Sequence, residues 1–138
     1  MWIQDSSAHY QYNTTEGAEE YARLLPSGGH TIFLDHGQSG GLTHSAVYTV
    51  TLFHQLKCLD IIRQQFAAIT DGSPALVQHC LNYLRQIILC YPNLRLEPAT
   101  NAAGNAMRGY DTVCRDWKVI YEEAERNHKI MNQGKKLT

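Results

Sequence analysis

The sequence predicts a mainly α fold in one small domain. Its 138 residues suit a single domain that can bury a core without cross-links. Three segments carry apolar residues at helical spacing, whereas extended patterns are confined to the N-terminal part. We therefore expect two antiparallel helices that bear histidine and cysteine, a third C-terminal helix, and a minor extended or β part at the N-terminus.

Residues 1–44 are expected to hold an extended arm, a short helix and a strand. Residues 2–10 mix aromatic and polar side chains without a helical period. Thr14 or Thr15 can cap a short helix that stops near Pro26. Residues 31–34 predict a strand, and the glycines of residues 37–41 predict a loop after it.

Residues 45–91 are expected to form the two motif helices. The first should span residues 45–70, although its β-branched start at 47–51 is also compatible with a strand. Ser73-Pro74 supplies a cap followed by proline at the first helical position, so the second helix should begin there and run to Cys90. Because the link between the two helices is short, they should pack as antiparallel neighbours.

Residues 92–110 are rich in Asn, Ala, Gly and Pro and predict a long loop with room for a brief strand at 94–96. The third helix is expected over residues 111–131, beginning near Cys114 and fraying after Asn127, with a tail at 132–138. We expect Trp117 and Tyr121 to lie in the core and His128 to be solvated.

Composition excludes several classes of partner. The formal net charge of −1 provides no general attraction to nucleic acid or to an acidic membrane surface. No segment has the length and hydropathy of a membrane-spanning helix, and residues 1–5 lack the features of a signal peptide. We therefore expect no nucleic acid partner and no membrane anchor within this chain, with homo- or hetero-oligomers left open.

The four cysteines leave the compartment open. Cys58, Cys80, Cys90 and Cys114 allow three disulfide pairings, and at least one bridge is expected in an oxidising lumen. In the cytosol they would be thiols or metal ligands. The sequon that begins at Asn13 favours the secretory pathway or secretion, and a cytoplasmic location stays possible.

Two clusters carry the chemistry. In the first, His54 and Cys58 are four residues apart and so share one helix face. In the second, His79 and Tyr83 have the same spacing, and Cys80 points about 100° away from His79. Imidazole and thiol are the side chains that change protonation or bind soft metals near neutral pH.

Three roles fit these residues. In the first, His54, Cys58 and His79 bind a metal such as copper, zinc or iron. In the second, His54 and His79 act as acid and base, with Lys57 as an electrostatic stabiliser. In the third, the clusters are core packing with hydrogen-bonded imidazoles, which is the commoner outcome for any single pair.

Other candidates have weaker signals. Arg85 suits a substrate carboxylate or phosphate, but an ion pair with Asp60 or Asp116 that links two helices is favoured. The remaining histidines near the glycine-rich loop have no compact ligand spacing and are expected to be surface or gating residues; they are His30, His36 and His44.

The two clusters resemble the paired motifs of the UstYa-like proteins of fungal secondary metabolism. Residues 54–59 resemble the family's His-Gln-Leu-His-Cys-Leu form, and residues 79–90 resemble its His-Cys, Leu-Arg-Gln and later Cys. Further family landmarks extend the resemblance to about residues 2–125, and they are residues 2–6, the segment that ends at Pro26, and residues 114–117.

The resemblance implies a tailoring enzyme that cyclises or oxidatively modifies a small natural-product intermediate. Relatives carry out oxidative cyclisation, hydroxylation, chlorination or desaturation and are thought to use copper, and many have an N-terminal membrane anchor, which we do not expect within these 138 residues. The site would then comprise His54, Lys57, His79, Tyr83 and Arg85.

Three departures from the family pattern open alternatives. Lys57, Leu76 and Thr112 stand where relatives often have histidine, and an ammonium beside a cation site weakens metal binding. The chain could therefore be a metal-independent cyclase, pericyclase or dehydratase that needs no cofactor. It could also be a non-catalytic partner of an active relative.

Overall fold

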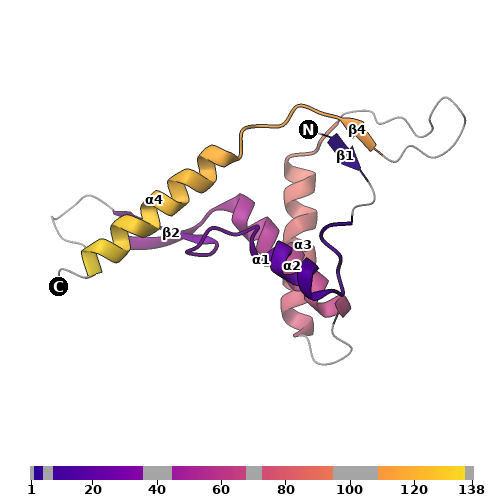
Figure 1. Ribbon diagram of the computed structural model, residues 1–138, viewed down its shortest axis with the longest axis horizontal. Helices are drawn as coiled ribbons and strands as arrows, with labels where there is room; N and C mark the ends of the chain where they lie inside the picture. The colour runs from indigo at the N-terminus through magenta and orange to yellow at the C-terminus, as the bar shows by residue number, and fades with distance from the viewer. Residues whose placement is uncertain (1, 5–7, 36–44, 68–72, 95–108, 136–138) are drawn as a thin grey trace, which may run out of the picture.

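The computed structural model describes residues 2–4, 8–35, 45–67, 73–94 and 109–135. Within these ranges the fold is mainly α with two small antiparallel sheets, which confirms the predicted fold class (Figure 1). The elements in chain order are β1 (Trp2–Gln4), α1 (Thr15–Ala22), β2 (Thr31–Asp35), β3 (Ser45–Thr49), α2 (Thr51–Ala67), α3 (Pro74–Cys90), β4 (Gly109–Asp111) and α4 (Lys118–Lys135).

The first motif helix begins later than the apolar spacing indicates. Residues 45–49 form β3, which pairs with β2 in the register Ile32↔Tyr48 and Phe33↔Val47. The β-branched run therefore forms a strand, as the alternative prediction had it, and α2 starts at Thr51. The hairpin matters for the site because it returns the chain from β2 directly into α2.

Helices α2 and α3 pack against each other as antiparallel neighbours, as predicted. His54 near the start of α2 contacts Tyr83 in the second half of α3, and Cys58, one turn later, contacts Cys80, one turn earlier. The start of α3 at Pro74 follows a residue with an N-cap conformation, Ser73, as the Ser-Pro signal predicts.

Helix α1 is capped as the sequence predicts. Thr14 Oγ1 accepts the backbone N–H of Gly17 at 3.0 Å. The N-terminal arm crosses this helix so closely that a Cβ on Gly17 would lie 1.9 Å from the carbonyl oxygen of Gln11. Only glycine allows that approach. Beyond the arm, β1 pairs with β4, so the N-terminal segment is joined to the segment that precedes α4.

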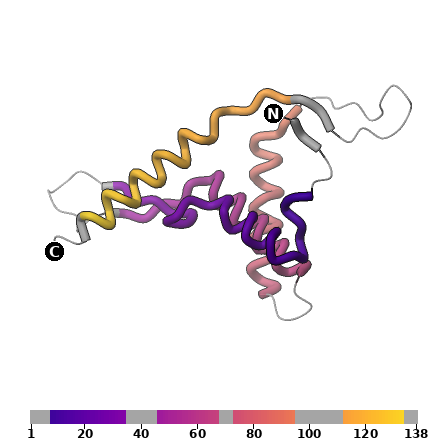
Figure 2. Tube along the Cα trace, in the orientation of Figure 1, coloured from indigo at the N-terminus to yellow at the C-terminus, as the bar shows by residue number. Residues whose placement is uncertain are grey.

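Helix α4 begins and ends later than predicted. It starts at Lys118 because the Asp116 carboxylate accepts the N–H of Lys118 at 3.1 Å, which leaves Cys114 outside the helix. It continues to Lys135 instead of fraying after Asn127, since it packs along β2 (Figures 1 and 2).

Two predictions about individual residues of this segment are wrong. His128 is buried, with 8% of its surface exposed, and its ring packs edge-on against Phe33. A side chain on Gly28 would collide with that imidazole, so the turn closes over it. Trp117 is 47% exposed and does not lie in the core, whereas Tyr121 is partly buried against Phe53.

Polar anchors hold α4 in place. The Asn127 side chain accepts the backbone N–H of Phe33 at 2.9 Å and donates to its carbonyl oxygen at 2.7 Å. Two residues earlier, the Glu125 carboxylate accepts the backbone N–H and the hydroxyl of Ser27. These hydrogen bonds lower the pKa of Glu125 because they favour its charged form.

Some expectations lie outside the described residues. These are the loop at 37–41 with His36 and His44, most of the loop at 92–110, including residues 95–96 of its brief strand, and the end of the C-terminal tail. Among the residues that were searched, no helix has the length and hydropathy needed to cross a membrane.

We expect Asn127→Ala to lower the free energy of unfolding by about 1–2 kcal/mol, because two partly buried backbone groups of Phe33 lose their partner. Urea unfolding followed by circular dichroism measures this. Asn132→Ala, at an exposed position of the same helix, is the matched control and should change stability little. Equal effects of the two substitutions would contradict the anchoring role.

Candidate functional site

Helix α2 divides its side chains between two opposite faces. His54 and Cys58 are four residues apart and lie on the face that packs against α3. Leu52, Leu56 and Leu59 lie on the other face, where they line a cavity beneath α1 and α4. The candidate site is therefore built on the α3 side of this helix.

The rings of the two predicted clusters converge. The His54 and Tyr83 rings stack with centroids 4.0 Å apart and planes 27° apart. The His79 ring lies 5.7 Å from that of His54, with planes 24° apart. The two imidazoles therefore meet between neighbouring helices.

A third imidazole joins them. The His30 ring centroid lies 6.4 Å from that of His54. The backbone places it there, because the N–H of Val50 donates to the His30 carbonyl oxygen at 3.3 Å where the β2–β3 hairpin leads into α2. From the sequence we expect His30 to be a surface or gating residue; it is half-buried and lies beside His54. We call His30, His54, His79 and Tyr83 the imidazole cluster.

No sequence spacing could have found His30. Residues 30 and 54 are far apart in the chain, and only the antiparallel pairing of β2 with β3 makes their neighbours adjacent. The one available signal was the position of His30 immediately before a predicted strand, which does not distinguish it from other loop residues.

The His54 imidazole is held in its neutral form. Burial lowers its pKa first, because desolvation disfavours the imidazolium, and His79 and His30 lower it further by charge repulsion. His54 is half-buried and His79 is exposed. The cluster thus combines a sheltered proton acceptor with a histidine that can exchange protons with solvent.

A pair of thiols lies one turn from the imidazoles. Cys58 is 1% exposed and Cys80 is fully buried, and their side chains are hydrogen-bonded across the helix pair. Burial, and then the hydrogen bond with Cys80, raise the pKa of Cys58 to about 12. Cys58 is therefore a protonated thiol, and both side chains serve the contact between α2 and α3. Cys90 and Cys114 are exposed.

The described residues fit a metal only in part. Imidazole nitrogens suit copper, and His54 and His79 lie close together. The Cys58 thiol, however, is engaged by Cys80. Across the described ranges, no group of three or more His, Cys, Asp or Glu side chains is arranged to hold a metal ion. The ligand set of His54, Cys58 and His79 is not assembled there.

The two predicted cations have different surroundings. Lys57 Nζ is 3.8 Å from Asp60 Oδ2, and Arg63 Nε donates to Asp60 Oδ1 at 2.9 Å. The side chain of Arg85 is exposed. Because Asp60 pairs with Arg63, and Asp116 caps α4, the expectation that Arg85 links two helices through either of them is wrong.

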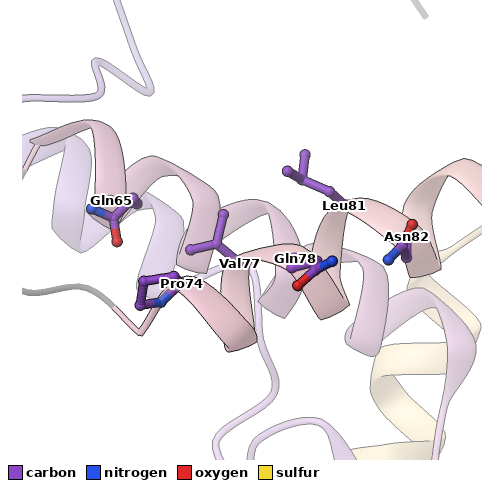
Figure 3. Close-up of a pocket in the computed structure, with 6 residues that line it drawn as sticks. All are labelled: Gln65, Pro74, Val77, Gln78, Leu81 and Asn82. Carbon is purple, nitrogen blue, oxygen red and sulfur yellow. The ribbon is translucent and has the colours of Figure 1, made fainter.

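A shallow cavity of about 480 Å³ opens on a different flank of α3 (Figure 3). Val77 and Leu81, four residues apart, line it together with Gln65 of α2. His79 and Tyr83 occupy another flank of the same helix. This cavity is therefore separate from the imidazole cluster.

The chain matches the family described as "Mycotoxin biosynthesis protein UstYa" over residues 2–126. It is 35% identical over 93 residues to "Oxidase ustYa" of Aspergillus flavus, a match that covers 62% of this chain and 44% of the relative. It is 37% identical over 81 residues to "UstYa family oxidase phomYb" of Diaporthe leptostromiformis, a match that covers 52% of this chain and 32% of the relative. No solved structure matches.

The chain therefore belongs to the UstYa family, as the paired motifs predict. This family acts in mycotoxin and secondary-metabolite biosynthesis, and the two relatives are named oxidases. The chain spans less than half the length of each of these relatives.

We expect His79→Gln to raise the pKa of His54, because the substitution removes the neighbouring charge that disfavours the imidazolium. Native His54 should protonate only below the pH at which a free imidazole does, about 6.5. NMR titration of the histidine ring protons measures the pKa of His54 in the native protein and in His79→Gln. His9→Gln, at an exposed histidine outside the cluster, should leave His54 unchanged. An identical His54 titration in the native protein and in His79→Gln would contradict the coupling.

We expect two fast and two slow thiols in the protein purified under reducing conditions. Cys90 and Cys114 should react first with a maleimide, and Cys58 and Cys80 only on unfolding, because the latter are buried and the Cys58 pKa is raised to about 12. Mass spectrometry of quenched samples identifies the labelled positions. Early labelling of Cys58 or Cys80 would contradict the buried contact.

Proposed function

We propose that this chain is a tailoring enzyme that modifies a small natural-product intermediate at the imidazole cluster. The observation that carries the proposal is the convergence of His54, His79 and Tyr83 from two adjacent helices. Core packing alone would not require three imidazoles side by side, of which one is exposed. Membership of a biosynthetic family supports the same conclusion.

The geometry favours proton transfer as the role of the imidazole cluster. His54 is neutral near pH 7 and can accept a proton from a bound substrate. The Tyr83 phenol stacks on it and can position the substrate or donate a hydrogen bond. His79, which is exposed, can return the proton to solvent. Such a set suits cyclisation, isomerisation or dehydration.

The names of the relatives favour an oxidative outcome, which we propose as the first reaction class. Copper, bound by imidazole nitrogens, would supply redox chemistry, but the described residues do not assemble its expected ligands. We therefore keep copper as a separate proposal with its own test. Lys57 and Arg85 keep their predicted roles only as proposals, since Lys57 is paired with Asp60.

A second candidate function is that of a partner for an active relative. Helix α3 exposes several large apolar side chains to solvent, as an interaction surface would. They are Leu76 at 45%, Leu81 at 54%, Ile88 at 64% and Leu89 at 67% exposure. This candidate is compatible with homo- or hetero-oligomers.

The compartment is a proposal as well. We propose the secretory pathway, because Asn13 of the sequon is exposed in the turn before α1 and is therefore accessible to a glycan. The contact of Cys58 with Cys80 marks these two thiols as the pair to cross-link under oxidising conditions.

We expect His54→Ala to reduce turnover of the substrate by about 10²–10⁴-fold, since it removes the proposed general base. His79→Ala should reduce it less, because solvent can replace a proton relay. Liquid chromatography with mass spectrometry of pathway intermediates incubated with the purified protein measures turnover. The mass change separates loss of two hydrogens, gain of oxygen, loss of water and isomerisation.

His9→Ala is the control, because this histidine lies outside the cluster. Elemental analysis of protein purified without chelator tests copper: one equivalent that is lost in His54→Ala would support the metal. Full turnover by His54→Ala would contradict the proposed site. Turnover only when a relative is co-expressed would favour the partner function.

A further inference from the structure

An aromatic-walled cavity of about 590 Å³ lies on the face of α2 opposite the imidazole cluster. Its floor consists of Leu52, Leu56 and Leu59 of α2. Tyr10 and Tyr21 form one wall. The proposed function leaves this cavity without a role, and its volume is within the range typical of small-molecule sites, about 300–1,000 Å³.

The second wall comes from the C-terminal segment. Trp117 and Tyr121 pack edge-to-face, with centroids 5.4 Å apart. The Tyr121 hydroxyl donates to the Leu24 carbonyl oxygen at 2.7 Å, and its ring packs edge-on against buried Phe53 at 4.8 Å. This wall is therefore held in place before any ligand arrives.

The first wall is also held in place, at a cost in backbone strain. Tyr10 has a φ of 58°, a left-handed conformation that is uncommon for a residue other than glycine. Its N–H donates to the Glu20 carboxylate, and its ring packs edge-to-face on Tyr21 with centroids 5.5 Å apart. This conformation places the Tyr10 ring at the cavity, whereas an extended backbone would direct the ring elsewhere.

The cavity is open at its rim and lacks a free charge. Tyr10 is 45% exposed and Trp117 47%, so a ligand can enter between the two walls. The one charged side chain that the described lining includes is Arg23, and Glu19 neutralises it at 3.0 Å. Four aromatic rings above a leucine floor, with phenol hydroxyls and an indole N–H at their edges, match a flat apolar molecule.

We propose that this cavity binds a neutral, planar aromatic molecule of about two fused rings, separately from the imidazole cluster. The edge-to-face walls leave room for a ring to stack on Trp117 or Tyr10, and the hydroxyls can accept or donate one hydrogen bond to a phenol or ketone. The proposal does not depend on catalysis at His54.

Titration calorimetry and saturation-transfer NMR with 2-naphthol test it. We expect saturable binding to the native protein and at least tenfold weaker binding to Leu56→Trp, which fills the cavity from its floor. The matched control is Leu81→Trp, which places the same ring in the other cavity, on α3, and should leave binding unchanged. Circular dichroism and the His54 titration establish that each variant is folded.

A second variant avoids the risk that a filled cavity disturbs folding. Tyr10→Gly removes one wall and relieves the left-handed strain, so it should fold and bind 2-naphthol several-fold more weakly. 2-Naphthoate should bind more weakly than 2-naphthol, because no free cation compensates its charge. The proposal is overturned if 2-naphthol does not bind, if Leu81→Trp abolishes binding while Leu56→Trp does not, or if the anion binds more tightly.

Discussion

The contact between α2 and α3 is the constraint on which the rest of the candidate site depends. Cys58 and Cys80 are small enough to let the helices approach and are completely buried where they meet. That approach brings His54 onto Tyr83 at 4.0 Å one turn away. Larger side chains at the two cysteine positions would separate α2 from α3, and the His54 ring from the Tyr83 ring. The two buried cysteines of the motifs therefore act here through packing.

The hairpin and α4 complete the arrangement from outside the motifs. The hairpin returns the chain so that His30 stands beside His54, and Asn127 of α4 holds the other side of β2 through both backbone groups of Phe33. The effect on His54 is electrostatic. Partial burial and then two neighbouring imidazoles lower the pKa of His54, so it is less protonated near pH 6.5 than a free imidazole, which is half-charged there.

Helix α2 contributes side chains both to the contact with α3 and to the aromatic-walled cavity. Alternate sides of residues 52–59 supply His54 and Cys58 to the α3 contact and three leucines to the aromatic-walled cavity. The helix therefore presents its motif residues to α3 and its leucines to the cavity. The cavity also explains why Trp117 is not in the core. Its spacing from other apolar residues suggested burial, but it lines an open cavity and is 47% exposed.

The sequence by itself indicated the helices, the cap at Thr14, the start of α3 at Pro74, the family, and the approach of His54 to His79, because these follow from local spacing and a short antiparallel connection. It also indicated the strand at 31–34 and the ambiguity at 47–51. Tertiary structure alone decided that His30 joins the cluster, that His128 is buried, and that the two cysteines face each other. These depend on contacts between residues distant in the chain, and such contacts are set by packing between elements, which no local pattern encodes.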